Sequence, residues 1–379
     1  MPTPTPSESK PELYSPIGDL ETPALLVDVD VMERNIDRYA SMAEDNGVRL
    51  RSHAKTHKIP DIAHRQHTQS DGGGIVCQKL SEAEVMAASG LEDIYLSYQV
   101  VGDRKLDRLV HLSETVDRFA TTVDGVGNID PLAAAAKRHD TSVRVILEID
   151  IGLGRTGVEP GEPALQLADR IVDHPHLEFA GVMAYEAHVK WEAESEAEYE
   201  TLCHEAMEET ARTVRMIEDE GIPVDEVKVG GTATSPYSSR HPVVTEINPG
   251  QYAFNDVGEI EARQWAVGKE DCALTVLSTV ISTQVDDQIV VDAGSKSLSM
   301  DTDRVPLSKH RDDLTYAGYS EEHGHIDTSD CEASFEVGDR IEFIAPHVCP
   351  TINLHDTLVD VRDGRVEEIW NIQARGKVR

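Results

Sequence analysis

Short apolar segments alternate with longer segments of helical periodicity over roughly the first 230 residues of the chain. The apolar segments are rich in β-branched residues and are bounded by polar or glycine-containing turns, which is typical of buried strands. Between most of them, apolar residues recur at the three- and four-residue spacing of a helix, most clearly over residues 194–219. We predict eight strands, at residues 24–29, 49–55, 74–78, 94–98, 119–123, 143–149, 179–185 and 226–229.

Repeated strand–helix units favour parallel strands, and eight of them predict an α/β fold with a closed (β/α)8 barrel over residues 19–260. An open, doubly wound sheet is the structural alternative. Such a sheet normally carries a glycine-rich turn after its first strand, whereas Asp28-Val29-Asp30-Val31 follows here. Helical periodicity then fades, so residues 261–379 are predicted to form a second, mainly β domain, with a polar, loop-like stretch at 297–330.

The chain is strongly acidic, with 70 Asp and Glu against 35 Lys and Arg and a formal net charge of -35 over 379 residues. This charge opposes binding to nucleic acids or anionic membranes, since both are polyanions. Residues 1–18 are predicted to be flexible and contain no apolar signal core, and no segment approaches the roughly 18 apolar residues of a membrane span. The five cysteines are widely spaced and form no disulfide framework. We expect a cytoplasmic protein.

The acidic residues are scattered along the chain, a pattern that fits a halophilic protein whose surface repulsion is screened by a very salty cytoplasm. We expect low salt to destabilise the protein, because a net charge of -35 then repels itself without screening. Urea unfolding followed by circular dichroism, in low salt and in molar NaCl, measures the effect. Undiminished stability in low salt would contradict the prediction.

Histidine and lysine are concentrated in Arg51-Ser52-His53-Ala54-Lys55-Thr56-His57-Lys58. On a strand, Arg51, His53 and Lys55 would project to the same face. A lysine among cationic neighbours loses its proton more readily, and the neutral amine can attack a carbonyl to form a Schiff base. A cationic rim that binds phosphate would have the same residues, so this segment alone leaves both interpretations open.

Polar residues also follow other predicted strands, at the ends where barrel enzymes carry their active sites. Gln78-Lys79 follows the third strand, the loop from Gly152 to Gly157 the sixth, and Tyr185-Glu186-Ala187-His188 the seventh. Gly230-Gly231-Thr232 follows the eighth. There, glycine lets backbone amides approach an anion and the threonine hydroxyl adds a donor, which favours a phosphate site over a simple tight turn.

A His-x-Cys pair, His347 and Cys349, stands near the C-terminus. On an extended segment, the two side chains would point to the same side and could ligate one ion. Two protein ligands would leave open positions for water or substrate, as in a catalytic metal site. Taken alone, such a pair is more often accidental than functional.

Together these residues resemble one family. The motifs that carry the resemblance are Arg51-x-His53-x-Lys55-Thr56-His57-Lys58, Gln78-Lys79-x-x-Glu82, Gly230-Gly231-Thr232, Pro249-Gly250-x-Tyr252 and His347-x-Cys349-Pro350-Thr351-x-Asn353-Leu354. Their order is similar to that in the D-threonine aldolase and D-serine dehydratase group, which consists of metal-assisted pyridoxal-phosphate enzymes of the alanine-racemase-like fold. The resemblance covers about residues 19–379.

The resemblance implies that Lys55 carries pyridoxal 5'-phosphate as a Schiff base, with Lys58 as the competing candidate. It further implies cofactor contacts from Gln78, Arg155 and Tyr185, phosphate contacts from Gly231, Thr232 and Tyr252, and metal binding by His347 and Cys349. His53 and His188 are alternative general bases or structural contacts. The resemblance also implies a homodimer.

The implied reaction is cleavage of a 3-hydroxy-D-amino acid, of the D-threonine aldolase type, to glycine and an aldehyde. The alternative is a dehydratase reaction that gives a 2-oxo acid and ammonia. Aldolases of the group resemble His-x-Asp at the metal and the eukaryotic-type D-serine dehydratases His-x-Cys. Cys349 therefore favours a dehydratase, and zinc over manganese or magnesium. The closing residues 369–376 favour the aldolase branch.

Two other functions share the barrel. An amino-acid racemase would give no role to a metal at His347 and Cys349. A non-catalytic pyridoxal-phosphate carrier would not need the extra β domain. Both alternatives explain fewer of the residues than a metal-assisted lyase does.

Overall fold

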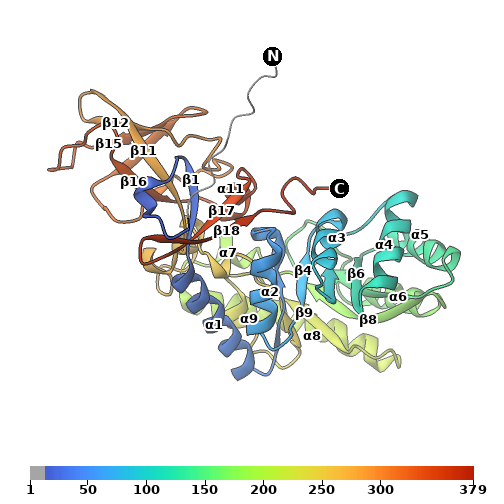
Figure 1. Ribbon diagram of the computed structural model, residues 1–379. Coiled ribbons are helices and arrows are strands. Elements are labelled where there is room, and N and C mark those ends of the chain that lie inside the picture. The colour runs from blue at the N-terminus through green and yellow to red at the C-terminus, as the bar shows by residue number, and fades with distance from the viewer. Residues whose placement is uncertain (1–12) are drawn as a thin grey trace, which may run out of the picture.

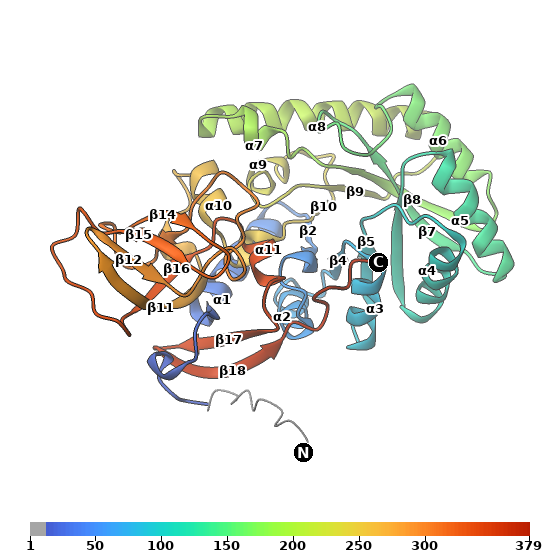
Figure 2. The ribbon, with the colours of Figure 1, turned by 90° about the horizontal axis from the view of Figure 1, so that it is seen from above.

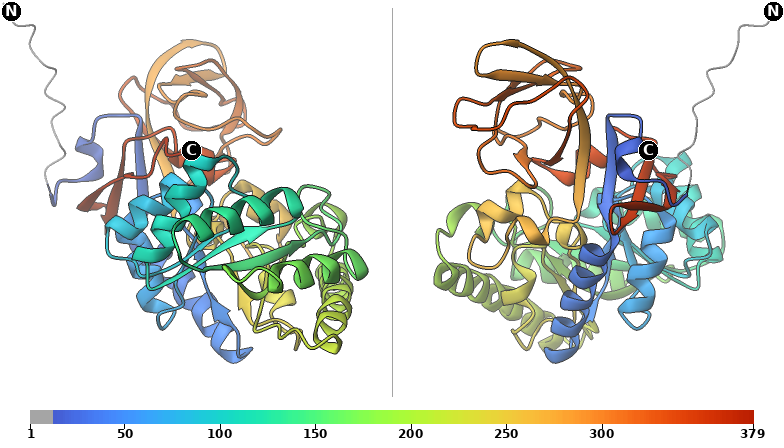
Figure 3. Two further views of the ribbon diagram at one scale, coloured as in Figure 1. Left: turned by 90° about the vertical axis from the view of Figure 1, so that its right-hand side faces the viewer. Right: turned by 60° about the vertical axis from the view of Figure 1, so that its left-hand side comes forward.

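The computed structural model describes residues 13–379, which form two parts that lie side by side (Figure 1). One part is a parallel sheet surrounded by helices, and the other is a largely antiparallel sheet. Figure 3 shows from two further sides how the second sheet sits above the barrel. The predicted barrel followed by a mainly β part is thus confirmed.

The barrel is a nine-stranded sheet with the order β2-β10-β9-β8-β7-β6-β5-β4-β3. β2 and β3 are two halves of one strand: β2 pairs with β10 and β3 pairs with β4, so the sheet closes through the residue between them. Counted in this way, the barrel has the predicted eight strands. The strands are β2 (Arg49–Leu50), β3 (Ser52–His53), β4 (Ile75–Cys77), β5 (Asp93–Leu96), β6 (Arg118–Val123), β7 (Val143–Ile149), β8 (Leu177–Ala184), β9 (Glu226–Val229) and β10 (Glu246–Ile247).

Arg51 separates β2 from β3, and it does not project toward the same site as Lys55. Its buried guanidinium donates to Glu246 of β10 at 2.9 Å and to Asp93 of β5 at 2.5 Å. Burial alone would favour the neutral acid, but Arg51 and Lys228 hold the pKa of Glu246 at about 2. Arg51 therefore stabilises the barrel across its point of closure.

The helices surround the barrel strands (Figure 2). They are α1 (Val29–Asp45), α2 (Pro60–Gln69), α3 (Leu80–Ala88), α4 (Asp103–Thr115), α5 (Val126–Arg138), α6 (Glu162–Val172), α7 (Val189–Glu192), α8 (Glu196–Asp219), α9 (Ser235–Ser238) and α10 (Val257–Ala262). None of the described helices is long and apolar enough to cross a membrane.

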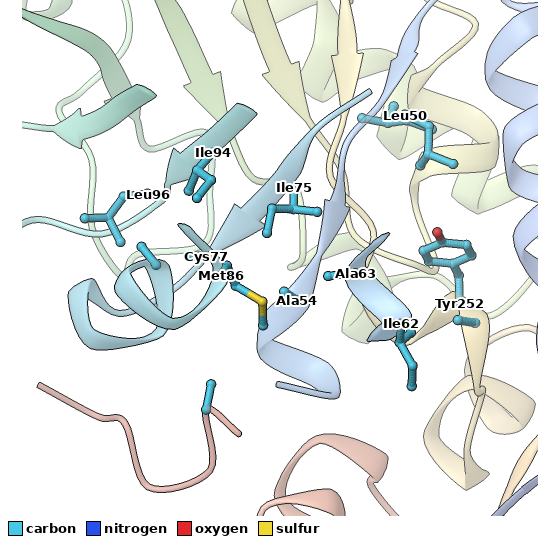
Figure 4. Close-up of a cluster of buried hydrophobic side chains, with 14 of the residues drawn as sticks. Leu50, Ala54, Ile62, Ala63, Ile75, Cys77, Met86, Ile94, Leu96 and Tyr252 are labelled. Atoms are coloured by element: carbon cyan, nitrogen blue, oxygen red, sulfur yellow. The ribbon is translucent and has the colours of Figure 1, made fainter. Parts of the chain in front are cut away.

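Strand periodicity divides the apolar side chains between two cores. Ile75 and Cys77 of β4 belong to the large core between the sheet and its helices, which Figure 4 shows beside α2 and α3. Val76, between them, and Tyr95 of β5 belong to a smaller cluster formed by β4 to β8. Both faces of each strand are therefore buried, which explains why the strands appear in the sequence as continuous apolar runs.

The second sheet has the order β12-β15-β14-β13-β16-β11-β1-β17-β18. The sheet consists of β1 (Ala24–Asp28), β11 (Leu274–Val285), β12 (Gln288–Val291), β13 (Leu307–Ser308), β14 (Thr315–Tyr319), β15 (Gly324–Asp327), β16 (Arg340–Ile344), β17 (Thr357–Arg362) and β18 (Arg365–Asn371). The short helix α11 (Val348–Ile352) connects β16 to β17.

β1 corrects the sequence prediction, which made this strand the first of the barrel. It instead pairs with β11 in the antiparallel and with β17 in the parallel direction, and it is drawn beside them in Figure 1. Leu25, Leu26 and Val27 are all buried in this position. An apolar strand followed by a helix has the same appearance in sequence whichever sheet it joins. The eighth barrel strand is β10, which at two residues was too short to be predicted.

Two further segments differ from their predicted character. The polar stretch at 297–330 contains β13, β14 and β15. Of the N-terminal segment predicted to be flexible, residues 1–12 lie outside the described residues. The rest is held against β18, because Tyr14 N–H donates to Val366 C=O at 2.7 Å and Val366 N–H donates to Ser15 C=O at 3.0 Å.

Candidate active site

A cavity of about 490 Å³ opens where the C-terminal ends of the barrel strands face the segment between β16 and β17. It brings together residues more than 290 positions apart in the chain, as Thr56 and Cys349 show. Nine of the predicted site residues line it, namely His53, Lys55, Gln78, Arg155, Tyr185, Gly231, Thr232, His347 and Cys349.

Lys55 enters this cavity from a short 3-10 helix, Ala54–Thr56, that begins directly after β3. The strand alternation used in the prediction therefore stops at His53. Among the described residues, no ion pair or hydrogen bond involves the Lys55 amine. Burial lowers the pKa of Lys55, and Arg155 lowers it further against the opposing effect of Cys349. A largely buried amine with a lowered pKa and no partner is suited to nucleophilic attack.

Lys58, the competing candidate, is engaged elsewhere. Its amine donates to the buried carboxylate of Glu82 at 2.6 Å, and Lys58 does not line the cavity. The other Glu82 oxygen accepts from the backbone N–H of Gln78 at 3.0 Å. Lys58 and Glu82 therefore support the loop that carries Lys55 and the end of β4.

Both ring nitrogens of His53 are in use. Nε2 lies 3.0 Å from Gln78 Oε1, and Nδ1 accepts from the Lys55 backbone N–H at 3.4 Å. Burial and the neighbouring Lys55 lower the pKa of His53 well below its ordinary value. A neutral ring with its proton on Nε2 satisfies both contacts. Since the Gln78 amide also donates to Ser97 C=O at 2.7 Å, the orientation of this pair is fixed.

Tyr185 and Arg155 meet on one wall of the cavity. The Arg155 guanidinium lies 5.1 Å from the centre of the Tyr185 ring, with Glu148 Oε1 at 3.6 Å from Arg155 Nη2. A Cβ atom on Gly231 would come within 3.1 Å of the Tyr185 ring. Glycine at 231 therefore keeps open the space in front of this aromatic ring.

The turn after β9 offers an unsatisfied donor. The Thr232 hydroxyl oxygen is buried and has no hydrogen-bond partner among the described residues. The Gly230 and Gly231 amides, in contrast, already donate to Glu186 and to Thr234, each at 3.0 Å. An orphaned buried hydroxyl in a cavity indicates a missing polar ligand. The predicted phosphate contact thus fits Thr232, whereas Gly231 contributes space.

His347 and Cys349 face the Lys55 loop. His347 caps α11 and Cys349 lies within its first turn, so the segment is not extended as predicted, yet both side chains line the cavity. The Cys349 thiol donates to the Thr56 hydroxyl at 3.4 Å. His347 Nδ1–H donates to Asp301 at 2.9 Å, which leaves Nε2 for a metal ion. Burial disfavours the charged form of His347, but its contacts with Cys349 and Asp301 outweigh this effect and raise the pKa of His347 to about 9.

Asp256, a buried residue that the sequence analysis did not single out, holds the backbone between His347 and Cys349 in place. Asp256 accepts from Val348 N–H at 2.9 Å and from the Gln251 amide at 2.7 Å through one oxygen. Its other oxygen accepts from Glu259 N–H at 2.9 Å and caps α10. Asp256, Asp301 and Arg304 were missed because no motif marks them and because two of them lie in the stretch taken for a featureless loop.

Tyr252 and His188 lie outside the lining of the cavity. The Tyr252 hydroxyl is hydrogen-bonded to Ser52 at 2.6 Å, and its ring belongs to the large core (Figure 4). His188 begins α7, and its ring would lie 3.1 Å from a Cβ atom on Gly152. Its buried Nδ1 has no partner among the described residues. The structure therefore does not bring these two predicted residues to the site.

Comparison with known families agrees with this geometry. Residues 27–256 match the family described as alanine racemase, N-terminal domain, and residues 273–361 match a putative serine dehydratase domain. The chain belongs to the alanine racemase N-terminal-domain family. Its relatives are aldolases and dehydratases of the fold-type III pyridoxal-phosphate enzymes, and the protein is a pyridoxal-phosphate-dependent lyase.

The similarity extends over nearly the whole chain. A 3-hydroxy-D-aspartate aldolase from Paracoccus denitrificans is 35% identical over 95% of this chain and 93% of its own length. The crystal structure of D-threonine aldolase from Filomicrobium marinum has a TM-score of 0.92 and 36% identity, and covers 97% of this chain and 100% of its own. D-threo-3-hydroxyaspartate dehydratase from Delftia sp. HT23 has a TM-score of 0.86 and 28% identity over 94% of this chain and 98% of its own.

Proposed function

We propose that this protein is a divalent-metal-assisted lyase of the D-threonine aldolase type, which cleaves 3-hydroxy-D-amino acids to glycine and an aldehyde. The observation that carries the proposal is the position of His347 and Cys349 in the same cavity as the unpaired Lys55 amine. A carbonyl-reactive amine and a metal-ligand pair are the two devices that this cleavage needs. The aldolase relatives also share more identity with this chain than the dehydratase does.

Three features of the cavity fit pyridoxal phosphate. Lys55 offers an amine without a partner, Thr232 offers an orphaned hydroxyl for the phosphate, and Gly231 leaves a slot beside the Tyr185 ring. Bound there, the cofactor supplies an electron sink for charge that develops at the substrate Cα, and a divalent ion supplies a Lewis acid for the β-hydroxyl. We assign the covalent attachment of the cofactor to Lys55, and contacts with one side of the cofactor to Arg155 and Tyr185.

His347 Nε2 and the Cys349 sulfur would hold the ion. Asp301 fixes the His347 ring through Nδ1, and Asp256 fixes the backbone between the two ligands. Because both side chains line the cavity, a substrate there could reach an ion that they hold. The soft thiolate of Cys349 favours zinc, and manganese is the alternative.

His53 serves as a positioning residue in this proposal. Its two nitrogens are occupied by Gln78 and by the Lys55 amide, so the ring has no free site at which to take a proton. His188 has a free nitrogen but lies behind Gly152, outside the cavity lining. Lys55, once released from the cofactor, is the amine best placed to move a proton at the substrate Cα.

A dehydratase is the second candidate, and Cys349 is the observation that favours it, since a thiol at this position resembles the dehydratase branch. The two reactions break different bonds of the same substrate. An aldolase breaks Cα–Cβ, whereas a dehydratase removes the α-proton and the β-hydroxyl.

Product analysis with D-threonine decides between them. The protein is incubated in high salt with pyridoxal phosphate and Zn²⁺ or Mn²⁺, with a metal-chelated sample as the control. We expect equal amounts of glycine and acetaldehyde, lost on chelation. Formation of 2-oxobutanoate and ammonia would identify a dehydratase, and no turnover of any 3-hydroxy-D-amino acid would overturn the proposed function.

A further inference from the structure

The cationic side chains of the cavity are not equivalent. The Lys190 amine donates to the buried Glu259 carboxylate at 2.7 Å, so its charge is already paired within the protein. Arg155 lies against Tyr185 on the proposed cofactor wall. Lys55 is the proposed attachment point. Apart from His347, which the proposal makes a metal ligand, the cationic side chain that is left in the lining is Arg304, and the proposed function gives it no role.

The Arg304 guanidinium is hydrogen-bonded to the described part of the protein through only one of its nitrogens, Nε. Its Nε donates to Glu261 of α10 at 2.5 Å, and its guanidinium lies 3.7 Å from the position of a Cβ atom on Gly258. The guanidinium is ion-paired with Glu261, but no described residue forms a hydrogen bond with its two terminal nitrogens. A guanidinium fixed through Nε, with both terminal N–H groups free, presents the fork that binds a carboxylate in bidentate fashion.

The location of Arg304 indicates which part of a substrate it meets. It lies in the same loop as Asp301, whose carboxylate accepts from His347. Arg304 therefore lines the cavity from the loop that also fixes the proposed metal ligand His347. An ion at His347 and Cys349 would bind the β-hydroxyl, so the other substituent of Cβ would lie near this ion too. Gly258, against which the Arg304 guanidinium lies, is also 3.2 Å (from the position of a Cβ atom) from an Asp256 oxygen, and Thr302 lines the cavity beside Arg304 in the chain, so the surroundings of Arg304 are polar.

We propose that Arg304 is a specificity-determining residue that selects 3-hydroxy-D-amino acids whose Cβ carries a carboxylate, in preference to those whose Cβ carries a methyl group. This inference rests on the proposed function and names its substrate class. The substrate is then a 3-hydroxy-D-aspartate. Cleavage of its Cα–Cβ bond, with the hydroxyl proton lost from oxygen and one proton gained at Cα, gives glycine and glyoxylate.

The experiment compares kcat/KM for D-3-hydroxyaspartate and for D-threonine in the wild-type holoenzyme, Arg304→Gln and Arg304→Lys. We expect the wild type to favour hydroxyaspartate, and the ratio of the two kcat/KM values to fall by about 10- to 100-fold in Arg304→Gln, the size of one charged hydrogen-bonded pair. Arg304→Lys, which keeps the charge but loses the fork, should recover part of the ratio. Arg240→Gln, in the exposed Arg240–Glu200 pair, is the matched control and should leave the ratio unchanged.

A second readout needs no turnover. D-aspartate and D-alanine lack the β-hydroxyl, and we expect D-aspartate to compete with D-threonine more strongly than D-alanine does, with the difference lost in Arg304→Gln. A wild-type preference for D-threonine, an equal loss for both substrates in Arg304→Gln, or equal inhibition by the two amino acids would each overturn the assignment. These outcomes differ from failure of the proposed function, in which neither hydroxy amino acid is cleaved to glycine.

Discussion

Lys55→Ala should lose the covalently attached cofactor and lower kcat by on the order of 10³-fold or more, because the residue that forms the bond is removed and no other amine replaces it. Lys190, the other lysine of the cavity lining, is bound to Glu259, and Lys58 is bound to Glu82. The fold should persist, since the Lys55 amine has no partner among the described residues to leave unsatisfied.

Attachment is measured by absorbance of the purified protein and by borohydride reduction followed by peptide mass mapping. Lys58→Gln is the parallel variant: it removes the competing lysine, and although it also removes the contact that Lys58 makes with Glu82, the cofactor should still be attached covalently to Lys55. A modified peptide that persists in Lys55→Ala and disappears in Lys58→Gln would move the attachment point to Lys58.

Cys349→Ala should reduce bound zinc from one ion per chain to a small fraction and lower activity by on the order of 100-fold, because one of two protein ligands is lost. Cys349→Asp keeps a ligand but replaces a soft sulfur with a hard oxygen, so its preference should move from zinc toward manganese. Metal content is measured by mass spectrometry of the dialysed protein, in parallel with turnover of D-threonine.

Cys331→Ala controls for the loss of a thiol, since Cys331 is also partly exposed but lies outside the cavity, between β15 and β16. It should retain both metal and activity. Full metal stoichiometry in Cys349→Ala would show that Cys349 is not a ligand, whatever the activity.

Much of the site could be predicted because its residues follow buried strands. Lys55, Gln78, Tyr185 and Thr232 come after β3, β4, β8 and β9, and parallel barrel strands bring these ends to one face. The apolar runs were long enough to mark the strands, and the order of the strands in the sheet then follows the order of the chain.

Residues outside this rule could not be predicted in the same way. Arg304 lines the cavity and Asp301 contacts His347 from the loop between β12 and β13, where strands as short as Leu307–Ser308 have little pattern of their own. Asp256 depends on a contact with Val348, almost a hundred positions later in the chain. Tyr252 was expected at the phosphate from its motif alone, and only the three-dimensional structure places its ring in the core.

The position of β1 has a consequence for how the protein is made. Leu26 pairs with Val359, so about 330 residues must be synthesised before this strand gains its parallel neighbour. At bacterial and eukaryotic translation rates of about 5–20 residues per second, the apolar segment waits for some tens of seconds. Its antiparallel neighbour β11 begins only at Leu274, so for most of this interval the strand has neither partner. An unpaired apolar strand can pair with other chains and aggregate. Because His347 and Cys349 lie just before Val359, a nascent chain cannot complete its second sheet or assemble its active site until translation is nearly finished.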